Sequence, residues 1–215
     1  MKLNLKVTKS KVKNHFTYGL WKYIAATALI IFGWNLIYTT SAYRTPPEKK
    51  VDLYVYAPAA VESTMEAYGA HLQQDVVPNM DEVNFVILSL SESDTYYDAQ
   101  IMVYVYANEG DAYILGRDKI KSLAGSGAFL DLAPYVESGA LDLTGIDTSY
   151  GMIYNEDANV TALYAIPLDS FNAMGKELAI ATSGTMAAVT AYSITPDEAV
   201  ACLNAMLQEF RSDNK

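Results

Sequence analysis

The sequence predicts an α/β domain built on an open mixed sheet, preceded by a single transmembrane helix. Strand-like and helix-like segments alternate from residue 51 to residue 123, which indicates a βαβαβ start with helices on both faces. Residues 151–193 carry hairpin-like patterns, so strands of both directions are expected. Before the domain, Trp21 to Tyr43 is the one stretch apolar for long enough to cross a bilayer, which takes about 20 residues.

The N-terminal region predicts a cytoplasmic basic segment over 1–18, a transmembrane helix over 19–43 and a linker over 44–50. Lysines without any acidic residue precede the apolar run, and aromatic residues flank it, as at the two interfaces of a spanning helix. This pattern places the N-terminus in the cytoplasm and residues 51–215 outside the cell membrane. A secretory signal that is cleaved after the small residues 40–42 remains the alternative, and the domain is exported in either case.

The charge excludes two classes of partner, and the cysteine content excludes an internal disulfide. The net charge is −10, yet residues 51–215 hold six Lys or Arg against 24 Asp or Glu, a net charge of −18. Nucleic acid and anionic lipid would repel such a domain, so neither is expected as a partner of it. The single cysteine, Cys202, excludes an intramolecular disulfide and is expected to be a small packing residue of an apolar helix.

The first half of the domain is expected to follow a paired-proline spacer, which favours extended chain. Alternation predicts a strand over 51–57, helical spacing predicts a helix over 61–76, and the apolar run 83–90 predicts a strand covered on both faces. Ser93 or Asp94 is expected to cap a helix that ends near Gly110, although its IMVYVY run is typical of strands. A short strand over 111–115 and a helix over 117–123 complete this half.

The second half is expected to be rich in strands. Segments 151–154 and 162–168 flank a polar turn and predict a hairpin, and segments 178–181 and 186–193 flank Ser183 and Gly184 as a second strand pair. The terminal helix carries the clearest start signal, because Thr195, Pro196 and Glu198 supply an N-cap, a first-turn proline and a capping-box acid.

Signals for catalysis are weak, and no enzyme activity, cofactor or metal site is predicted. The sequence holds no HExxH, GxSxG, P-loop or paired-cysteine spacing. His71 stands alone on an amphipathic helix, where a solvated or partly packed side chain is the ordinary case. In an open α/β sheet ligands bind beyond the carboxyl ends of the strands, which here are 56–58, 90–93 and 115–117.

Three short motifs carry a family resemblance. The segment 111–136, DAYILGRDKIKSLAGSGAFLDLAPYV, resembles a segment of bacterial extracellular solute-binding proteins, the receptor components of ABC importers. LYAIPL at 163–168 is similar to a strand that leads across the hinge between the two lobes of those proteins, and TPDEAVACLNAML at 195–207 resembles their closing helix. The resemblance implies a periplasmic-binding-protein-like fold, shortened to about one lobe.

Two functions remain open at this stage. In the first, a membrane-tethered domain binds a small polar solute or presents it to an ABC-type permease; the expected contacts are Tyr56, Ala57, Gly116, Arg117, Asp169 and Ser170. In the second, the lobe has lost solute binding and docks as an interaction module to a membrane or exported partner. An ordinary turn that ends a strand explains Asp169 and Ser170 as well.

Overall fold

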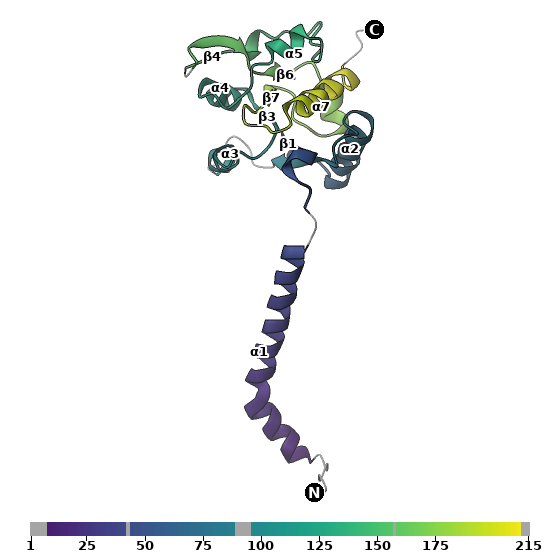
Figure 1. Ribbon diagram of the computed structural model, residues 1–215, viewed down its shortest axis with the longest axis vertical. Coiled ribbons are helices and arrows are strands. Elements are labelled where there is room, and N and C mark those ends of the chain that lie inside the picture. Colours follow the sequence, from purple (N-terminus) through teal and green to yellow (C-terminus); the bar gives the residue numbers. More distant parts are fainter. Residues whose placement is uncertain (1–7, 42–43, 89–95, 157, 212–215) are drawn as a thin grey trace. The chain divides into compact units, whose positions relative to one another are not determined.

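The computed structural model describes residues 8–41, 44–88, 96–156 and 158–211, and it divides into two compact units, Met1–Arg44 and Thr45–Lys215 (Figure 1). The second unit is an α/β domain, as the sequence predicts. Each unit is described by itself.

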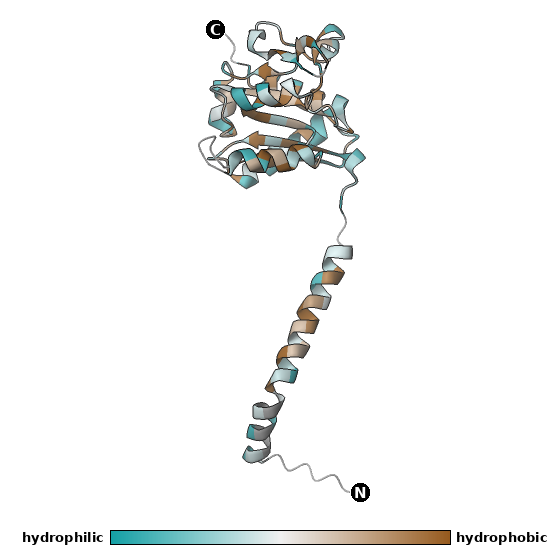
Figure 2. Ribbon diagram, turned by 90° about the vertical axis from the view of Figure 1, so that its left-hand side faces the viewer, coloured by the Kyte–Doolittle hydropathy of each residue, from teal (hydrophilic) through white to brown (hydrophobic). Residues whose placement is uncertain are grey.

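The first unit consists of helix α1, Lys9–Ser41, whose part from Gly19 to Ser41 is long and apolar enough to cross a membrane. Twenty-three residues rise about 34 Å as a helix, against about 30 Å of hydrocarbon. None of this stretch is buried by other parts of the chain, and its apolar residues stand out in Figure 2. Near its end the hydroxyls of Thr39 and Thr40 donate to backbone oxygens one turn earlier, which removes polar groups from the helix surface. This geometry suits both a retained anchor and a signal sequence.

The second unit is organised by a five-stranded mixed sheet in the order β2-β1-β3-β7-β6. Strand β1 pairs in parallel with β2 and β3, whereas β7 runs antiparallel to β3 and β6, so the predicted mixed sheet is confirmed. The strands are β1 Lys50–Tyr56, β2 Glu82–Leu88, β3 Ala112–Gly116, β6 Ile166–Pro167 and β7 Thr185–Val189.

Helices cover both faces of this sheet, because alternate side chains of its strands feed two separate cores (Figure 1). On one face Val51, Leu53 and Val55 pack with helices α2, Glu62–Asp75, and α7, Pro196–Glu209. On the other face Tyr54, Tyr113 and Leu115 pack with α3, Tyr97–Tyr106, and α4, Arg117–Gly125. The two-residue period of the strands therefore places one hydrophobic layer on each side of the sheet.

The predicted first hairpin is present as a separate two-stranded sheet of β4, Met152–Asn155, and β5, Val160–Leu163. The predicted second strand pair is wrong. Residues 178–181 form no strand and follow the short helix α6, Asn172–Glu177, and β7 pairs instead with β3 and β6. The remaining short elements are η1 Pro47–Lys49, α5 Ala133–Glu137 and η2 Ser149–Gly151.

Strand β2 has core contacts on both faces, as expected: Phe85 and Ile87 pack against one core and Val86 and Leu88 pack in the other, although residues 84–87 at this edge of the sheet are only half-buried. Three other local expectations need correction or lie outside the described residues. The spacer before β1 contains the 3₁₀ turn η1 and is not extended throughout. The capping box of α7 does not form, since the Thr195 hydroxyl donates to the Lys50 carbonyl at 3.3 Å. The expected caps of α3, Ser93 and Asp94, lie outside the described residues.

Candidate functional site

The carboxyl end of β3 positions the first candidate residue, Arg117. Gly116 ends the strand in register with Thr185 of β7, and Arg117 is the first residue of α4. The Arg117 amide donates to the Gly184 carbonyl at 2.9 Å, so the start of the helix is held against the turn before β7. The backbone therefore fixes where the Arg117 side chain leaves the sheet.

The Arg117 guanidinium is held by an acid and by an aromatic ring from two other parts of the chain. Its Nη2 lies 2.8 Å from Asp169 Oδ2, and its Cζ lies 4.0 Å from the centre of the Tyr150 ring. Asp169 is oriented in turn, because its Oδ1 accepts from the Gly184 amide at 2.9 Å. The Arg117 Nε is buried and has no hydrogen-bond partner among the described residues.

These groups line an open cleft of about 510 Å³. Its floor and rim include Arg117, Gly145, Ile146, Asp147, Tyr150, Pro167, Asp169 and Ser170. A hydrogen bond from the Ser149 amide, at 3.0 Å, lowers the pKa of Asp147 from its ordinary value, so this carboxylate is ionised at neutral pH. Lys121 lies near the same ring, with Nζ 5.7 Å from the Tyr150 centre. The cleft therefore combines two acids, one arginine and an aromatic ring, with a lysine near that ring.

Of the six residues that the sequence proposes as contacts, three line the cleft and a fourth adjoins one of them. Arg117, Asp169 and Ser170 line the cleft, and the buried Gly116 supplies the strand end beside it. Tyr56 and Ala57 do not line it: the Tyr56 carbonyl accepts from the Ala181 amide at 2.9 Å, and Ala57 is fully buried. These two complete the neighbouring strand end and act in packing.

Of the cleft residues that the sequence did not reveal, Tyr150 is the one that contacts Arg117 through its ring. It lies in the 3₁₀ turn η2 just before the hairpin, and 49% of its surface is exposed. The available signal was an aromatic residue in the polar, glycine-containing stretch TGIDTSYG, where no core position explains it.

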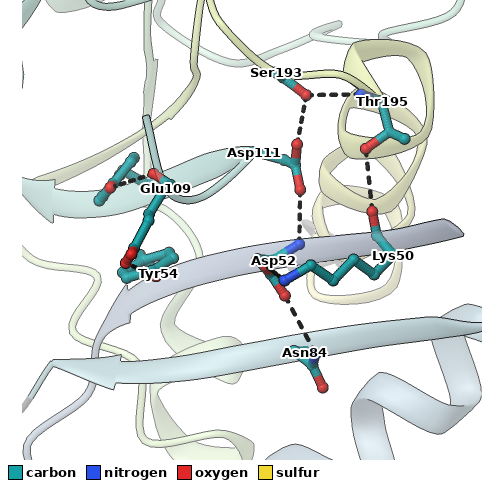
Figure 3. Close-up of polar contacts among 9 residues, drawn as sticks. Lys50, Asp52, Tyr54, Asn84, Glu109, Asp111, Ser193 and Thr195 are labelled. Carbon is teal, nitrogen blue, oxygen red and sulfur yellow. Dashed lines mark hydrogen bonds and ion pairs between the residues drawn. The ribbon is translucent and has the colours of Figure 1, made fainter. Parts of the chain in front are cut away.

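A second polar group lies at the opposite, amino ends of β1 and β3 (Figure 3). Asp111 accepts hydrogen bonds from the Asp52 amide at 2.8 Å and the Ser193 hydroxyl at 2.6 Å. Asp52 in turn pairs with Lys50 and accepts from Asn84 at 3.2 Å. Burial raises the pKa of Asp111 above its ordinary value, although its hydrogen bonds oppose the shift. These contacts join both strands to the turn that leads into α7.

Glu109 extends this polar group toward the tyrosines of the second core (Figure 3). Its carboxylate accepts from the Tyr54 hydroxyl at 3.2 Å, and its carbonyl accepts from the Tyr113 hydroxyl at 2.7 Å and the Tyr192 hydroxyl at 3.2 Å. Because these hydrogen bonds tie both strands to the turn before α7 and to the tyrosines, the arrangement stabilises the fold.

Within the described ranges no three His, Cys, Asp or Glu side chains gather as a metal site would require. His71 lies on the surface of α2, where its Nδ1 is 2.8 Å from Asp75 Oδ2 and its Nε2 is 3.7 Å from Glu209 Oε2. This pairing makes it a helix-surface residue rather than part of the cleft.

Comparison with known proteins gives structural matches alone. No family model and no curated protein matches the sequence. Among solved structures, a family 1 extracellular solute-binding protein from Alicyclobacillus acidocaldarius is 17% identical, with a TM-score of 0.42 over 58% of this chain and 29% of that one. An ABC substrate-binding protein from Listeria monocytogenes, in complex with cycloalternan, is 14% identical, with a TM-score of 0.40 over 54% and 28%.

The GacH receptor of Streptomyces glaucescens is 17% identical, with a TM-score of 0.42 over 55% of this chain and 28% of that one. The chain thus spans less than a third of the length of these structures. By name, the first is an extracellular solute-binding protein and the second an ABC substrate-binding protein, the kind of protein that the sequence motifs resemble.

Proposed function

We propose that the domain binds a small polar solute in the cleft at the carboxyl end of β3 and that α1 holds it at a membrane, where it presents the solute to an ABC-type permease. One observation carries this proposal: Arg117 is fixed by Asp169 and stacked on Tyr150 at the open side of the sheet end. Three separate chain segments converge on that one guanidinium.

The arrangement suits binding because Arg117 and Asp169 are held in place while some of their hydrogen-bonding groups remain unpaired. A guanidinium carries five N–H donors, and the Arg117 side chain is 26% exposed while its Nη2 pairs with Asp169, so a solute oxygen can reach donors that this pair leaves unused. Asp169 is half-exposed, with 48% of its side chain accessible, and an ionised carboxylate accepts more than the bonds that it makes here. Tyr150 supplies a flat apolar ring beside these polar groups.

The charges of the cleft define the class of solute. Arg117 lines the cleft with Asp147 and Asp169, and Lys121 lies near the Tyr150 ring, so positive and negative charges nearly balance there and a neutral or zwitterionic solute fits better than a strongly charged one. The cleft is open to solvent and no second wall closes over it among the described residues, so we expect a Kd of about 1 mM, equivalent to about −4 kcal/mol.

Tethering offsets weak binding. A domain held at a membrane by α1 stays close to a permease in the same membrane, and its effective concentration there reaches the millimolar range for a short linker. Release of the solute is then fast, because affinity is low. Weak capture and high local concentration are compatible properties of such a receptor.

A thermal-shift screen of the full chain in detergent tests the proposal, with neutral sugars, amino acids and charged metabolites at up to about tenfold their expected Kd. Saturation at ten times Kd stabilises the domain by about 1.4 kcal/mol, or about 3–6 °C. Arg117→Lys removes the fork geometry and should abolish this shift.

Arg211→Lys is the matched control. Arg211 also pairs with an acid, Asp142, and its buried Nε also has no hydrogen-bond partner among the residues that the structure describes, yet it lies outside the cleft. No stabilisation by any neutral or zwitterionic solute, or an equal loss of the shift in both variants, would contradict solute binding at this place.

A second candidate function is a non-catalytic interaction module that docks to a membrane or exported partner. The open edge of the sheet at β2 favours it, because an edge strand offers unpaired backbone groups to another chain. The two functions use opposite sides of the domain's first strand and do not exclude each other.

A further inference from the structure

Strand β2 leaves one side of its backbone unpaired within the described part of the chain. It pairs with β1 alone, and the Ala57 amide donates to the Leu88 carbonyl at 3.3 Å, so the backbone groups of Leu88 face β1. Because these groups alternate along a strand, those of Phe85 and Ile87 face away from β1. The middle and end of β2 therefore present donors and acceptors at the edge of the sheet.

A groove of about 680 Å³ follows this edge. One wall comes from α2, through Glu62, Met65, Glu66, Ala70 and Gln73, and the strand itself supplies residues 82–86. On the far side the groove reaches Lys50, Asp52 and Tyr54 of β1. An added strand would thus meet backbone along its length and side chains above and below, which is the geometry of β-augmentation.

The groove is acidic. Glu62, Glu66 and Asp81 are exposed along it, and Glu82 is half-buried. Its one lysine, Lys50, is already paired with Asp52, so it does not offset the four remaining carboxylates. A second copy of this chain would bring the same four acids against them, and like charges across an interface are repelled.

We propose that this edge groove binds an extended polypeptide segment that carries Lys or Arg at alternate positions. Its backbone pairs with the outward groups of β2, and its basic side chains lie against Glu62 and Glu66 of α2. The ligand is a segment of another protein. This inference stands apart from solute binding, because none of its residues lines the cleft of Arg117.

Fluorescence anisotropy with a labelled Lys-Val-Lys-Thr-Lys-Val-Lys-Thr peptide and the full chain in zwitterionic nanodiscs tests it. We expect saturable binding that weakens with salt. A peptide of the same sequence with alternating L- and D-residues keeps the charge but forms no regular strand, and we expect at least tenfold weaker binding. A peptide with Glu in place of Lys should not bind.

The protein variants carry a matched control. Glu62→Lys with Glu66→Lys reverses two exposed charges of the groove and should weaken binding at least tenfold. Glu137→Lys with Glu156→Lys makes the same change in net charge at two exposed acids outside it and should weaken binding less than threefold. Equal loss in the two double variants, equal binding of the L,D-peptide, absence of binding, or a homodimer that the peptide dissociates would each overturn the proposal.

Discussion

Replacing Gly69 by alanine tests the close approach of α2 to β2, on which the acidic groove depends. A Cβ atom at this position would lie 2.3 Å from the backbone oxygen of Val83 and 3.4 Å from its carbonyl carbon. That oxygen cannot turn away, because β2 is paired with β1 along its whole length. Helix α2 must then move outward by about 1 Å to restore an ordinary contact.

Two opposing effects determine how much the free energy of unfolding falls in Gly69→Ala. Overpacking against fixed backbone falls at the upper end of its usual range, about 3 kcal/mol, since Met65, Tyr68 and Leu72 lose contacts when α2 moves. Alanine in place of glycine within a helix returns about 1 kcal/mol. We therefore expect Gly69→Ala to destabilise the domain by about 2 kcal/mol, and to lower its Tm by about 4–8 °C.

Urea unfolding followed by near-ultraviolet circular dichroism measures this change. Both tryptophans, Trp21 and Trp34, lie in α1, so tryptophan fluorescence would not report on the domain. Gly125→Ala is the control, because its nearest neighbour, the Tyr154 carbonyl oxygen, is 3.8 Å away, and no loss of stability is expected. If Gly69→Ala is as stable as the wild type or more stable, the packing described between α2 and β2 is wrong.

Three further predictions concern buried groups. Burial raises the pKa of Asp111, so the folded chain holds a proton on this carboxyl at a pH where the unfolded chain releases it. The contribution of Asp111 to stability therefore falls as the pH rises from below 4 through the raised pKa. In urea titrations the stability of wild type relative to Asp111→Asn should decrease over that pH range, and an increase would contradict this. Burial raises the pKa of Cys202 to about 12, so a disulfide reagent at pH 8 should label it in urea but not in the native chain. Tyr113→Phe removes a 2.7 Å hydrogen bond to the Glu109 carbonyl and should cost about 1 kcal/mol in urea unfolding, with a neutral result arguing against that bond.

Local patterns predicted the elements wherever one periodicity dominated. The alternation of β1 and the helical spacing of α2 both survive in the structure. Helix α3 contains the strand-like run IMVYVY, yet it is helical because Tyr97 and Ile101, four residues apart, are buried on one face. Tertiary packing there overrides the β-propensity of the residues.

The order of the strands and the hydrogen-bond partners of individual side chains could not be predicted from the sequence. A continuous apolar run does not reveal that β2 lies at an edge, because the period says nothing about neighbours. Thr195 is a residue type that commonly caps helices, but its hydroxyl donates instead to the carbonyl of Lys50, which is distant in sequence. Competition between local and long-range hydrogen bonds is decided by the fold.

The sequence predicted two residues of the candidate site but not their contacts. Arg117 and Asp169 could be named because each follows a strand end, where open α/β sheets place their ligands. Their pairing across 52 residues, and the Tyr150 ring beneath the guanidinium, depend on how η2 and β6 return to the sheet. No spacing in the sequence carries that information.

The most direct test of solute binding at the cleft is the nuclear magnetic resonance signal of Arg117 Nε–H in the labelled full chain during titration with a stabilising solute. This N–H belongs to the guanidinium that the solute would contact, so a solute bound there changes its chemical shift. We predict a saturable shift at Arg117 with the same Kd as the thermal stabilisation, and no shift at Arg211 Nε. A stabilising solute that leaves the Arg117 signal unchanged would contradict the account.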